Sequence, residues 1–377
     1  MIDRVVIKNF KSIGEPGVEL ELKPLTLLVG PNGSGKSSIL EAVALMVQTF
    51  NVSASNAAMW GLLQRVSLET PMPVWPPIVK LDFDSPQVLA HAIGEARQMS
   101  LQLQVGDQGY RFLYDPASNR VVSHELLRQG GRNEEKAPWD PACALLRESL
   151  VKVFLISALR GRVESKVSTY RGGGAAIERL DWTGPDGEYL IHFLSSSRYS
   201  SNVGNRNKIR REAKRFGIGD LWAGWAGGTD LVGKFSDPVL HTRLSIALAS
   251  SGSRQILTIL TNLLWLEQGS IFLIEEPEIS LHPEGQVKVC ELFAEVIRKE
   301  QKQIVATTHS TFLPLAIGKL VREKRLAVKD VAVYEIEKKR GVGTVATRLE
   351  MDNKGNIKGW IPSFSKVERE LLREWLK

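Results

Sequence analysis

Alternating and continuous runs of apolar residues mark regular elements near the start of the chain. Residues 5–7 and 18–22 alternate apolar and polar side chains across a Gly-Glu-Pro-Gly turn, which predicts a β-hairpin. Residues 25–29 are continuously apolar, as in a strand that is buried on both faces. A glycine-rich loop follows, and residues 38–50 then have helical spacing. The order strand, glycine loop and helix predicts a βα unit of an α/β fold.

The middle of the chain is less regular. Residues 78–83 alternate, and residues 101–105 and 110–114 flank a Gly-Asp-Gln-Gly turn, which predicts a second antiparallel hairpin. Residues 151–156 form another apolar run with the character of a buried strand. Glycine- and serine-rich stretches bracket the part with the weakest periodicity, and we predict that residues 151–240 form an inserted, helical lobe.

Regular patterns return after residue 240. Helices and strands are predicted to alternate at 253–267, 270–274, 284–300 and 303–306. A last hairpin is predicted from residues 331–336 and 344–349. We therefore expect three parts: residues 1–150 with the first βα unit and antiparallel strands, the lobe, and residues 241–377, which complete the main domain.

Composition narrows the class of protein. The 377 residues are 43% hydrophobic and 24% charged, the balance of a folded chain rather than a disordered or collagen-like one. The longest apolar run, residues 256–266, falls short of the roughly 18 residues of a membrane span, and the charged start Met1-Ile2-Asp3-Arg4 predicts no signal peptide. Cys143 and Cys290 are too far apart for a CxxC motif, so we expect a protein of the reducing cytoplasm without membrane attachment.

Residues 30–37, Gly-Pro-Asn-Gly-Ser-Gly-Lys-Ser, match the phosphate-binding loop pattern GxxxxGK[ST] at every fixed position. In such loops backbone N–H groups surround the β-phosphate, Lys36 is expected to reach the β- and γ-phosphates, and Ser37 is expected to ligate Mg²⁺. A chance glycine loop is the alternative, with a probability of about one in a hundred for this length. The predicted nucleotide contacts are Asn32, Gly33, Ser34, Gly35, Lys36, Ser37 and Ser38.

Two carboxylates follow the strand predicted at residues 270–274. Consecutive strand residues face opposite ways, so Glu275 and Glu276 are expected to have different roles. Glu275 would lie beside Mg²⁺ under the phosphates, and Glu276 would polarise the attacking water. An acidic surface pair is the alternative for a strand end taken alone, and the phosphate-binding loop favours the catalytic interpretation.

A cluster of small residues opens the helix predicted at 253–267. The cluster consists of Ser250, Ser251, Gly252 and Ser253. Its N–H groups and hydroxyls are suited to a phosphate at a helix N-terminus, although such clusters are commonly only N-caps. His309 follows the strand at 303–306, and this context favours a γ-phosphate contact over an ordinary structural histidine.

The order of these motifs resembles that of an ATP-binding-cassette (ABC) ATPase, in the branch that contains RecF, SMC proteins and the overcoming-lysogenization-defect (OLD) proteins. Residues 7–12, Ile-Lys-Asn-Phe-Lys-Ser, are similar to the opening strand motif of that branch, which implies that Lys11 approaches the nucleotide. Residues 250–253 resemble the signature motif, and residues 279–283 resemble the D-loop.

The same resemblance places Glu275 and Glu276 at the end of the Walker B strand and His309 at the switch histidine. The wording Glu-Glu-Pro-Glu-Ile-Ser-Leu-His-Pro is typical of the OLD-like group rather than of transporters. Residues after 315 contain no acidic constellation that resembles the Toprim nuclease domain, and the middle of the chain lacks the coiled-coil arms of SMC proteins.

The resemblance implies an ABC-type P-loop NTPase fold with a mixed central sheet, an antiparallel β subdomain and an inserted helical lobe. It implies ATP and Mg²⁺ as cofactors, with Lys36, Glu276 and His309 as catalytic residues. In this family the signature motif of one subunit closes the nucleotide bound by another, which implies a head-to-tail homodimer around two ATP molecules.

The positive charge is concentrated in one segment. Residues 198–215 contain seven basic residues and one acid, Glu212, so they hold almost all of the net charge of +7. A solvated surface helix and a phosphate-contacting patch explain such a run equally well. The nucleic-acid interpretation assigns contacts to Arg206, Arg210, Arg211 and Lys214.

Three interpretations of function stay open. The first is an ATPase that senses or clamps nucleic acid in DNA maintenance or anti-phage defence. The second is an ATP-switched regulatory subunit that controls a separate effector nuclease or toxin without contacting DNA. The third, a self-contained nuclease, is disfavoured because metal-site carboxylates are missing, and the OLD-like wording disfavours a transporter subunit. Stimulation of ATP hydrolysis by duplex DNA separates the first from the second.

Overall fold

The computed structural model describes residues 1–55, 98–115, 120–128, 133–136, 140–163, 167–168, 182–226, 230–359, 361–364 and 373. The strand predicted at residues 78–83 lies outside this range. The chain forms two compact units, each assembled from separate segments. The first comprises Met1–Leu155, Gly269–Glu275 and Phe293–Lys377, and the second comprises Ile156–Gln268 and Glu276–Leu292.

A six-stranded, mostly parallel sheet organises the first unit, in the order β16-β15-β3-β14-β13-β8. Its strands are β3 (Leu25–Val29), β8 (Val153–Ile156), β13 (Ile271–Ile274), β14 (Gln303–Thr308), β15 (Val331–Lys339) and β16 (Gly343–Leu349). β3 pairs in parallel with β14 and β15, β13 pairs in parallel with β14, and β16 runs antiparallel at one edge. β3 and β13 are buried throughout, as their continuous apolar sequences predict.

A second sheet of the same unit is antiparallel, in the order β2-β1-β4-β5-β6-β7. It contains β1 (Arg4–Lys8), β2 (Val18–Glu21), β4 (Met99–Val105), β5 (Gln108–Asp115), β6 (Arg120–Arg128) and β7 (Glu134–Glu135). Every second residue of β2 and β4 is buried, so one face of the sheet covers the core. Both hairpins predicted for this region are confirmed, by the pairing of β1 with β2 and of β4 with β5.

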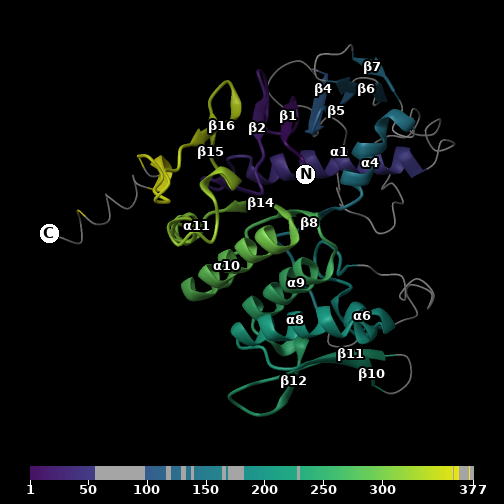
Figure 1. Cartoon of the computed structure of the whole chain (residues 1–377), viewed down its shortest axis with the longest axis vertical. Helices are drawn as coiled ribbons and strands as arrows, with labels where there is room; N and C mark the ends of the chain where they lie inside the picture. The colour runs from purple at the N-terminus through teal and green to yellow at the C-terminus, as the bar shows by residue number, and fades with distance from the viewer. Residues whose placement is uncertain are drawn as a thin grey trace. The chain divides into compact units, whose positions relative to one another are not determined.

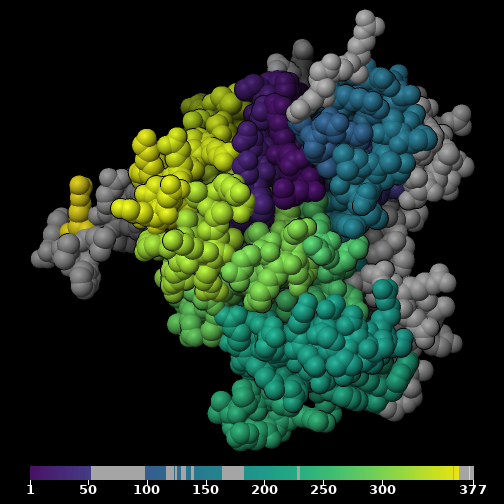
Figure 2. All heavy atoms as spheres, in the orientation of Figure 1, coloured from purple at the N-terminus to yellow at the C-terminus, as the bar shows by residue number. Residues whose placement is uncertain are grey.

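Helix α1 (Lys36–Ser55) packs against both sheets, touching β1 and β4 of one and β13 and β14 of the other (Figure 1). Because both sides are covered, every residue from Ile39 to Phe50 except Glu41 is buried. The ring of Phe50 meets Tyr110 edge to face, with 4.8 Å between centroids. Figure 2 shows the purple N-terminal segment between the blue strands and the yellow C-terminal hairpin. Packing in the core therefore fixes the position of α1 and of the loop that precedes it.

Further helices complete the first unit. They are η1 (Pro141–Cys143), α4 (Ala144–Leu150), α11 (Phe312–Arg322), η4 (Val328–Asp330) and the part of α10 (Pro283–Glu300) that begins at Phe293. The sequence pattern does not predict α11, which contains Pro314. This proline lies in the first turn of the helix, where its missing N–H has no intrahelical partner to lose.

The second unit combines helices with an antiparallel sheet. It contains α6 (Leu190–Ser195), α7 (Ser197–Ser201), α8 (Val203–Arg215), α9 (Ser251–Trp265), η3 (Ile246–Leu248), β9 (Val167–Ser168), β10 (Leu221–Trp225), β11 (Asp230–Ser236) and β12 (Arg243–Ser245). The predicted lobe thus carries a sheet beside its helices. A Cβ at Gly233 of β11 would lie 2.1 Å from Ile191 Cδ1, so this glycine lets α6 pack directly on the sheet. Within the described ranges, no helix is long and apolar enough to cross a bilayer.

Candidate nucleotide site

Three adjacent parallel strands end at one edge of the central sheet. β14 lies between β3 and β13, with Thr308 opposite Val29 and Ala306 opposite Ile274. The segments that follow these strands are the phosphate-binding loop, His309 and Glu275. Parallel strands place the residues after their carboxyl ends at one edge, so the structure brings these predicted site residues together.

The phosphate-binding loop, residues 30–37, turns tightly from β3 into α1. Gly30 has φ +149°, and a Cβ there would lie 2.2 Å from the carbonyl oxygen of Ile336 in β15. Only glycine fits this close approach. Asn32 and Gly33 are exposed at the tip, and Ile39 N–H donates the first helical bond to Gly35 O at 3.2 Å. The tip therefore adjoins a helix N-terminus, where backbone N–H groups favour an anion.

Lys36 folds back onto its own loop. Its Nζ donates to Gly30 O at 2.9 Å and Pro31 O at 2.8 Å and lies 3.4 Å from Ser34 Oγ. The residue is only 4% exposed, so the loop oxygens compensate an otherwise unfavourable buried charge. Phosphate oxygens carry full charge and are stronger acceptors than carbonyls. Lys36 is therefore already positioned inside the loop that would receive them.

Lys11 pairs with a carboxylate that the sequence pattern does not single out. Its Nζ lies 2.6 Å from Glu41 Oε2 on α1, one helical turn after Ser37. Burial raises the pKa of Glu41, the hydrogen bond from Lys11 opposes this, and the charge of Glu275 raises it further. Glu41 lies four residues after Ser37 and therefore on the same face of α1. This spacing is the signal from which a place for Glu41 near the site could have been predicted.

Ser37 and Glu275 are the candidate Mg²⁺ ligands. Ser37 is exposed in the first turn of α1, and Glu275 is half-buried directly after β13. In the described part of the chain, no three His, Cys, Asp or Glu side chains are grouped to hold a metal. Mg²⁺ prefers oxygen ligands and is commonly held by one or two protein groups together with substrate phosphates. This small donor set fits an ion that arrives with a nucleotide.

Glu276 does not continue the strand before it. β13 ends at Ile274, and Glu276 has φ +42°. The expectation that strand alternation separates Glu275 from Glu276 is therefore wrong, since a left-handed turn sets the direction of Glu276. Arg160 holds this turn: its Nη2 donates to Glu276 O at 2.7 Å, and its Nη1 donates to Ser157 O at 3.0 Å. Nothing in the local sequence signals this role, because the two residues are far apart along the chain.

We expect Arg160→Lys to lower kcat for ATP hydrolysis roughly tenfold, with KM for ATP within about twofold of its original value. A lysine ammonium cannot reproduce the rigid guanidinium fork that donates to both carbonyls, so the Glu276 turn would loosen. Steady-state ATPase kinetics measure the effect. Arg162→Lys makes the same change at a neighbouring exposed position, and equal kcat values for the two variants would contradict the role of Arg160.

The predicted signature residues form the N-terminus of α9. Ser250 is the N-cap, and its Oγ accepts the N–H of Ser253 at 3.1 Å. The hydroxyls of Ser250 and Ser253 lie 2.8 Å apart. Ser250 and Ser251 are exposed, so capping leaves hydroxyls and N–H groups of the first turn at the surface.

The residues that resemble the D-loop pack against the signature residues inside the second unit. A Cβ at Gly252 would lie 2.5 Å from Ser280 O, and the hydroxyls of Ser251 and Ser280 are 3.2 Å apart. Ser280 has φ +60°, which turns the chain toward α9. Glycine at position 252 therefore permits the contact that keeps the two motifs together.

The basic segment lies on α7 and α8, and two of its four candidate nucleic-acid contacts donate to backbone carbonyls of the protein. Arg206 Nη1 donates to Ser200 O at 2.9 Å, and Arg210 Nη2 donates to Leu221 O at 2.8 Å. These bonds attach α8 to the chain before it and to β10. Arg206 and Arg210 therefore contribute to the fold of the lobe.

The other two candidates face outward. The side chains of Arg211 and Lys214 are 65% and 60% exposed. Each has an acidic neighbour at 3.3 Å, Glu212 for Arg211 and Asp220 for Lys214. The Lys214–Asp220 pair is exposed on both sides and is worth little. Glu212 is buried and also bonds to Arg215 at 2.7 Å, so it does not depend on Arg211 alone. Both outward-facing cations are therefore accessible to a phosphate.

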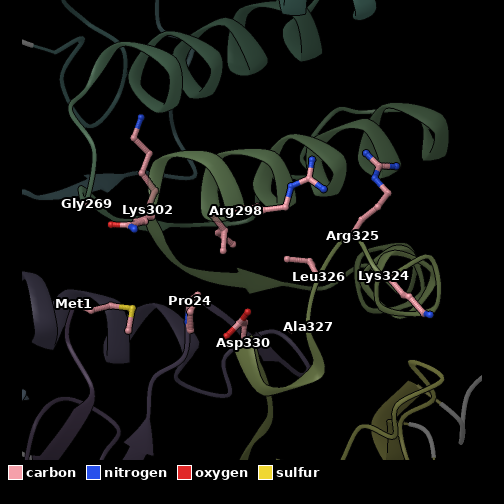
Figure 3. Close-up of a pocket in the computed structure, with 12 residues that line it drawn as sticks. Met1, Pro24, Gly269, Arg298, Lys302, Lys324, Arg325, Leu326, Ala327 and Asp330 are labelled. Carbon is pink, nitrogen blue, oxygen red and sulfur yellow. The ribbon is translucent and has the colours of Figure 1, made fainter.

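A cavity of about 700 Å³ lies at the opposite edge of the central sheet (Figure 3). Pro24, Gly269 and Lys302 line it and stand just before β3, β13 and β14. Figure 3 shows the Lys302 ammonium pointing away from Asp330, and it bonds to Glu300. None of the predicted site residues lines this cavity, so it is separate from the nucleotide site.

Comparison with solved structures shows the fold. An Smc head bound to the C-winged helix domain of ScpA superposes with a TM-score of 0.56 at 14% identity, over 93% of this chain and 98% of that one. The Smc head domain with an extended coiled coil bound to the C-terminal domain of ScpA, derived from Pyrococcus furiosus, gives 0.54 at 12% identity, over 100% and 99%. The chain thus has an SMC-head-like P-loop α/β fold with a mixed sheet and antiparallel sheets, which confirms the predicted class.

Comparison of sequences shows the family. The OLD nuclease of Thermus scotoductus is 45% identical over 47 residues, which are 12% of this chain and 8% of that protein. The match thus covers only a small fraction of that relative. This short sequence match to an OLD protein and the likeness of fold to SMC heads confirm the predicted resemblance. The family described as "AAA ATPase domain" matches residues 1–85 and 196–313, more than half of the chain. The chain belongs to the AAA ATPase domain family.

Proposed function

We propose that the protein binds ATP with Mg²⁺ and hydrolyses it. The observation that carries the proposal is the convergence of the phosphate-binding loop, His309 and Glu275 at one edge of the central sheet. Membership of the AAA ATPase domain family supports it. The roles follow from the chemistry of each group. Lys36 would bind the β- and γ-phosphates, Ser37 and Glu275 would hold Mg²⁺, and His309 would contact the γ-phosphate.

Catalysis in this proposal depends on positioning. Bound Mg²⁺ would supply neutralising charge at the phosphate oxygens. Glu276 would accept the proton of the attacking water, and the turn held by Arg160 would set its direction. Residues 32–38 would present backbone N–H groups to the phosphates, and Lys11, paired with Glu41, would lie at the edge of the nucleotide.

We further propose a head-to-tail homodimer in which the signature residues of one copy cover the nucleotide of the other. Each chain has one phosphate-binding loop and one signature motif, so two sites form from two chains. The exposed hydroxyls of Ser250 and Ser251 at the N-terminus of α9 support this, because a helix N-terminus favours an anion. The packing of Ser280 against Gly252 would let the D-loop respond when the signature is engaged.

For the biological role we propose nucleic-acid sensing or clamping, in DNA maintenance or anti-phage defence within the cytoplasm. Arg211 and Lys214 support this by their outward charge. Because Arg206 and Arg210 bond to backbone carbonyls, Arg211 and Lys214 are the candidate DNA contacts that stay available. This reduced number of contacts favours a second candidate function. In that alternative, ATP-driven dimerisation controls a separate effector nuclease or toxin without contact to DNA.

We expect Arg211→Glu with Lys214→Glu to weaken binding of duplex DNA roughly tenfold and to reduce the slope of log affinity against log salt, because two phosphate contacts are lost. The same variant would lose DNA-stimulated ATP turnover and keep basal turnover. Lys329→Glu with Lys338→Glu, both exposed in the first unit, is the charge-matched control. ATP turnover that is equal with and without duplex DNA in the wild-type protein would instead support the effector-control function.

A further inference from the structure

Thr344, in the hairpin of β15 and β16, contacts the phosphate-binding loop. Thr344 is the second residue of β16 and is 2% exposed. Its Oγ1 donates to Ser34 O in the loop at 2.9 Å. Its backbone N–H donates to Ser12 O at 2.8 Å, in the turn that carries Lys11. One residue therefore joins the edge strand, the Lys11 turn and the nucleotide loop.

The hydroxyl protons define the direction of this contact. Thr344 Oγ1 also lies 2.8 Å from Ser12 Oγ. A hydroxyl has one proton, and a carbonyl oxygen can only accept. The Thr344 proton therefore goes to Ser34 O, and Ser12 donates its own proton to Thr344. Ser12 thus holds the Thr344 hydroxyl in the orientation in which it donates to Ser34 O.

The bonded carbonyl sets the direction of an N–H group in the loop. Ser34 C=O and Gly35 N–H belong to one planar, trans peptide and point in opposite directions. Because the carbonyl points toward Thr344, the Gly35 N–H points away from β16. A Cβ on Gly35 would lie 2.2 Å from Thr344 Oγ1 and 2.8 Å from Ser12 Oγ, so the glycine lets the loop settle directly on the two hydroxyls.

We propose that Thr344 is a positioning residue of the nucleotide site, which orients the Ser34–Gly35 peptide so that the Gly35 N–H meets the β-phosphate. This inference rests on the proposed ATP binding and adds a residue 310 positions from the loop in sequence. It makes the β15–β16 hairpin part of the nucleotide site through the contact of Thr344 with the loop.

The test is the affinity of the full chain for MgADP, measured by calorimetry, with kcat and KM for ATP measured in parallel. Thr344→Val keeps the shape and removes the hydroxyl, and we expect Kd for MgADP and KM for ATP to rise roughly tenfold, about 1.4 kcal/mol. We expect kcat to stay within about twofold, because Lys36 and Glu276 keep their own contacts. Thr344→Ser restores the hydroxyl and should return both values to within about twofold of wild type.

Thr347→Val is the matched control, since it makes the same change at an exposed position of β16. Unchanged Kd in Thr344→Val, or equal losses in Thr344→Val and Thr347→Val, would overturn the inference. If Thr344→Val does not fold, Ser12→Ala decides: the Thr344 hydroxyl loses its holding donor, and Kd should rise roughly threefold, whereas an unchanged Kd overturns the proposal. A wild-type chain that binds neither ADP nor ATP would overturn the proposed function itself, which is a separate outcome.

Discussion

Lys36→Met should lower kcat/KM for ATP hydrolysis by two or more orders of magnitude. In the proposed mechanism the Lys36 ammonium bonds to the β- and γ-phosphates, where negative charge develops, and losing one such donor commonly costs roughly 10²–10³ in rate. The effect on binding should also be large, because charge-assisted bonds are about twice as strong as neutral ones. Steady-state ATPase assays and calorimetry with MgATP measure the two effects.

The interpretation of Lys36→Met depends on the fold being kept. Lys36 Nζ now bonds to Gly30 O and Pro31 O, and methionine keeps most of the length of the side chain while removing the buried charge. Thermal unfolding without nucleotide should therefore change little, whereas the rise in Tm caused by MgATP should disappear. Lys329→Met, at an exposed position, is the control. Full activity in Lys36→Met would remove this loop from the proposed mechanism.

Glu276→Gln should abolish turnover while leaving ATP bound. A general base contributes roughly 10²–10⁴ in rate, and glutamine has nearly the same shape but cannot accept the proton. Arg160 bonds to the backbone oxygen of Glu276, so the substitution leaves the contact that holds the turn. We expect kcat to fall by at least about 100-fold and Kd for MgATP to stay within about threefold.

The same variant tests the composite dimer. Because hydrolysis would no longer release the two copies, Glu276→Gln with saturating MgATP should run as a dimer on sizing with light scattering and return to monomer when Mg²⁺ is chelated. Glu275→Gln separates the two carboxylates: its turnover should recover in part at raised Mg²⁺, because Glu275 would ligate the ion. A strictly monomeric Glu276→Gln protein at saturating MgATP would refute the head-to-tail arrangement.

The elements that the sequence predicts well are those with local causes. The βα unit of β3, the phosphate-binding loop and α1 follows from an apolar run, glycines at fixed spacing and a helical period, all within residues 25–50. The hairpin of β15 and β16 and the helix α10 have equally local signals. In these segments the conformation of each residue depends on neighbours a few positions away. The sequence pattern therefore predicts the element without knowledge of the tertiary structure.

The elements that the sequence pattern does not show have distant causes. β10 contains Gly224 and α11 contains Pro314, and these residues weaken the local signal for a strand and for a helix. Packing decides both: β10 pairs with β11, where Gly233 leaves room for Ile191 of α6, and Leu313 and Ile317 of α11 are fully buried. The basic segment shows the same limit, because its charges are visible in the sequence while the carbonyls that bind Arg206 and Arg210 are not.

The amino-acid sequence by itself determined the phosphate-binding loop, the two carboxylates after β13, the signature-like cluster and hence the family, because glycine spacing and residue type specify this chemistry locally. Only the tertiary structure decided that β14 places His309 between the loop and Glu275, that Lys11 pairs with Glu41, and that Glu276 leaves the strand through a turn. It also decided that Arg160 and Thr344, 116 and 310 positions away, hold Glu276 and Ser34 by hydrogen bonds. The physical reason is that a hydrogen bond depends on distance in space, and sequence separation sets that distance only within a turn, a hairpin or a helix.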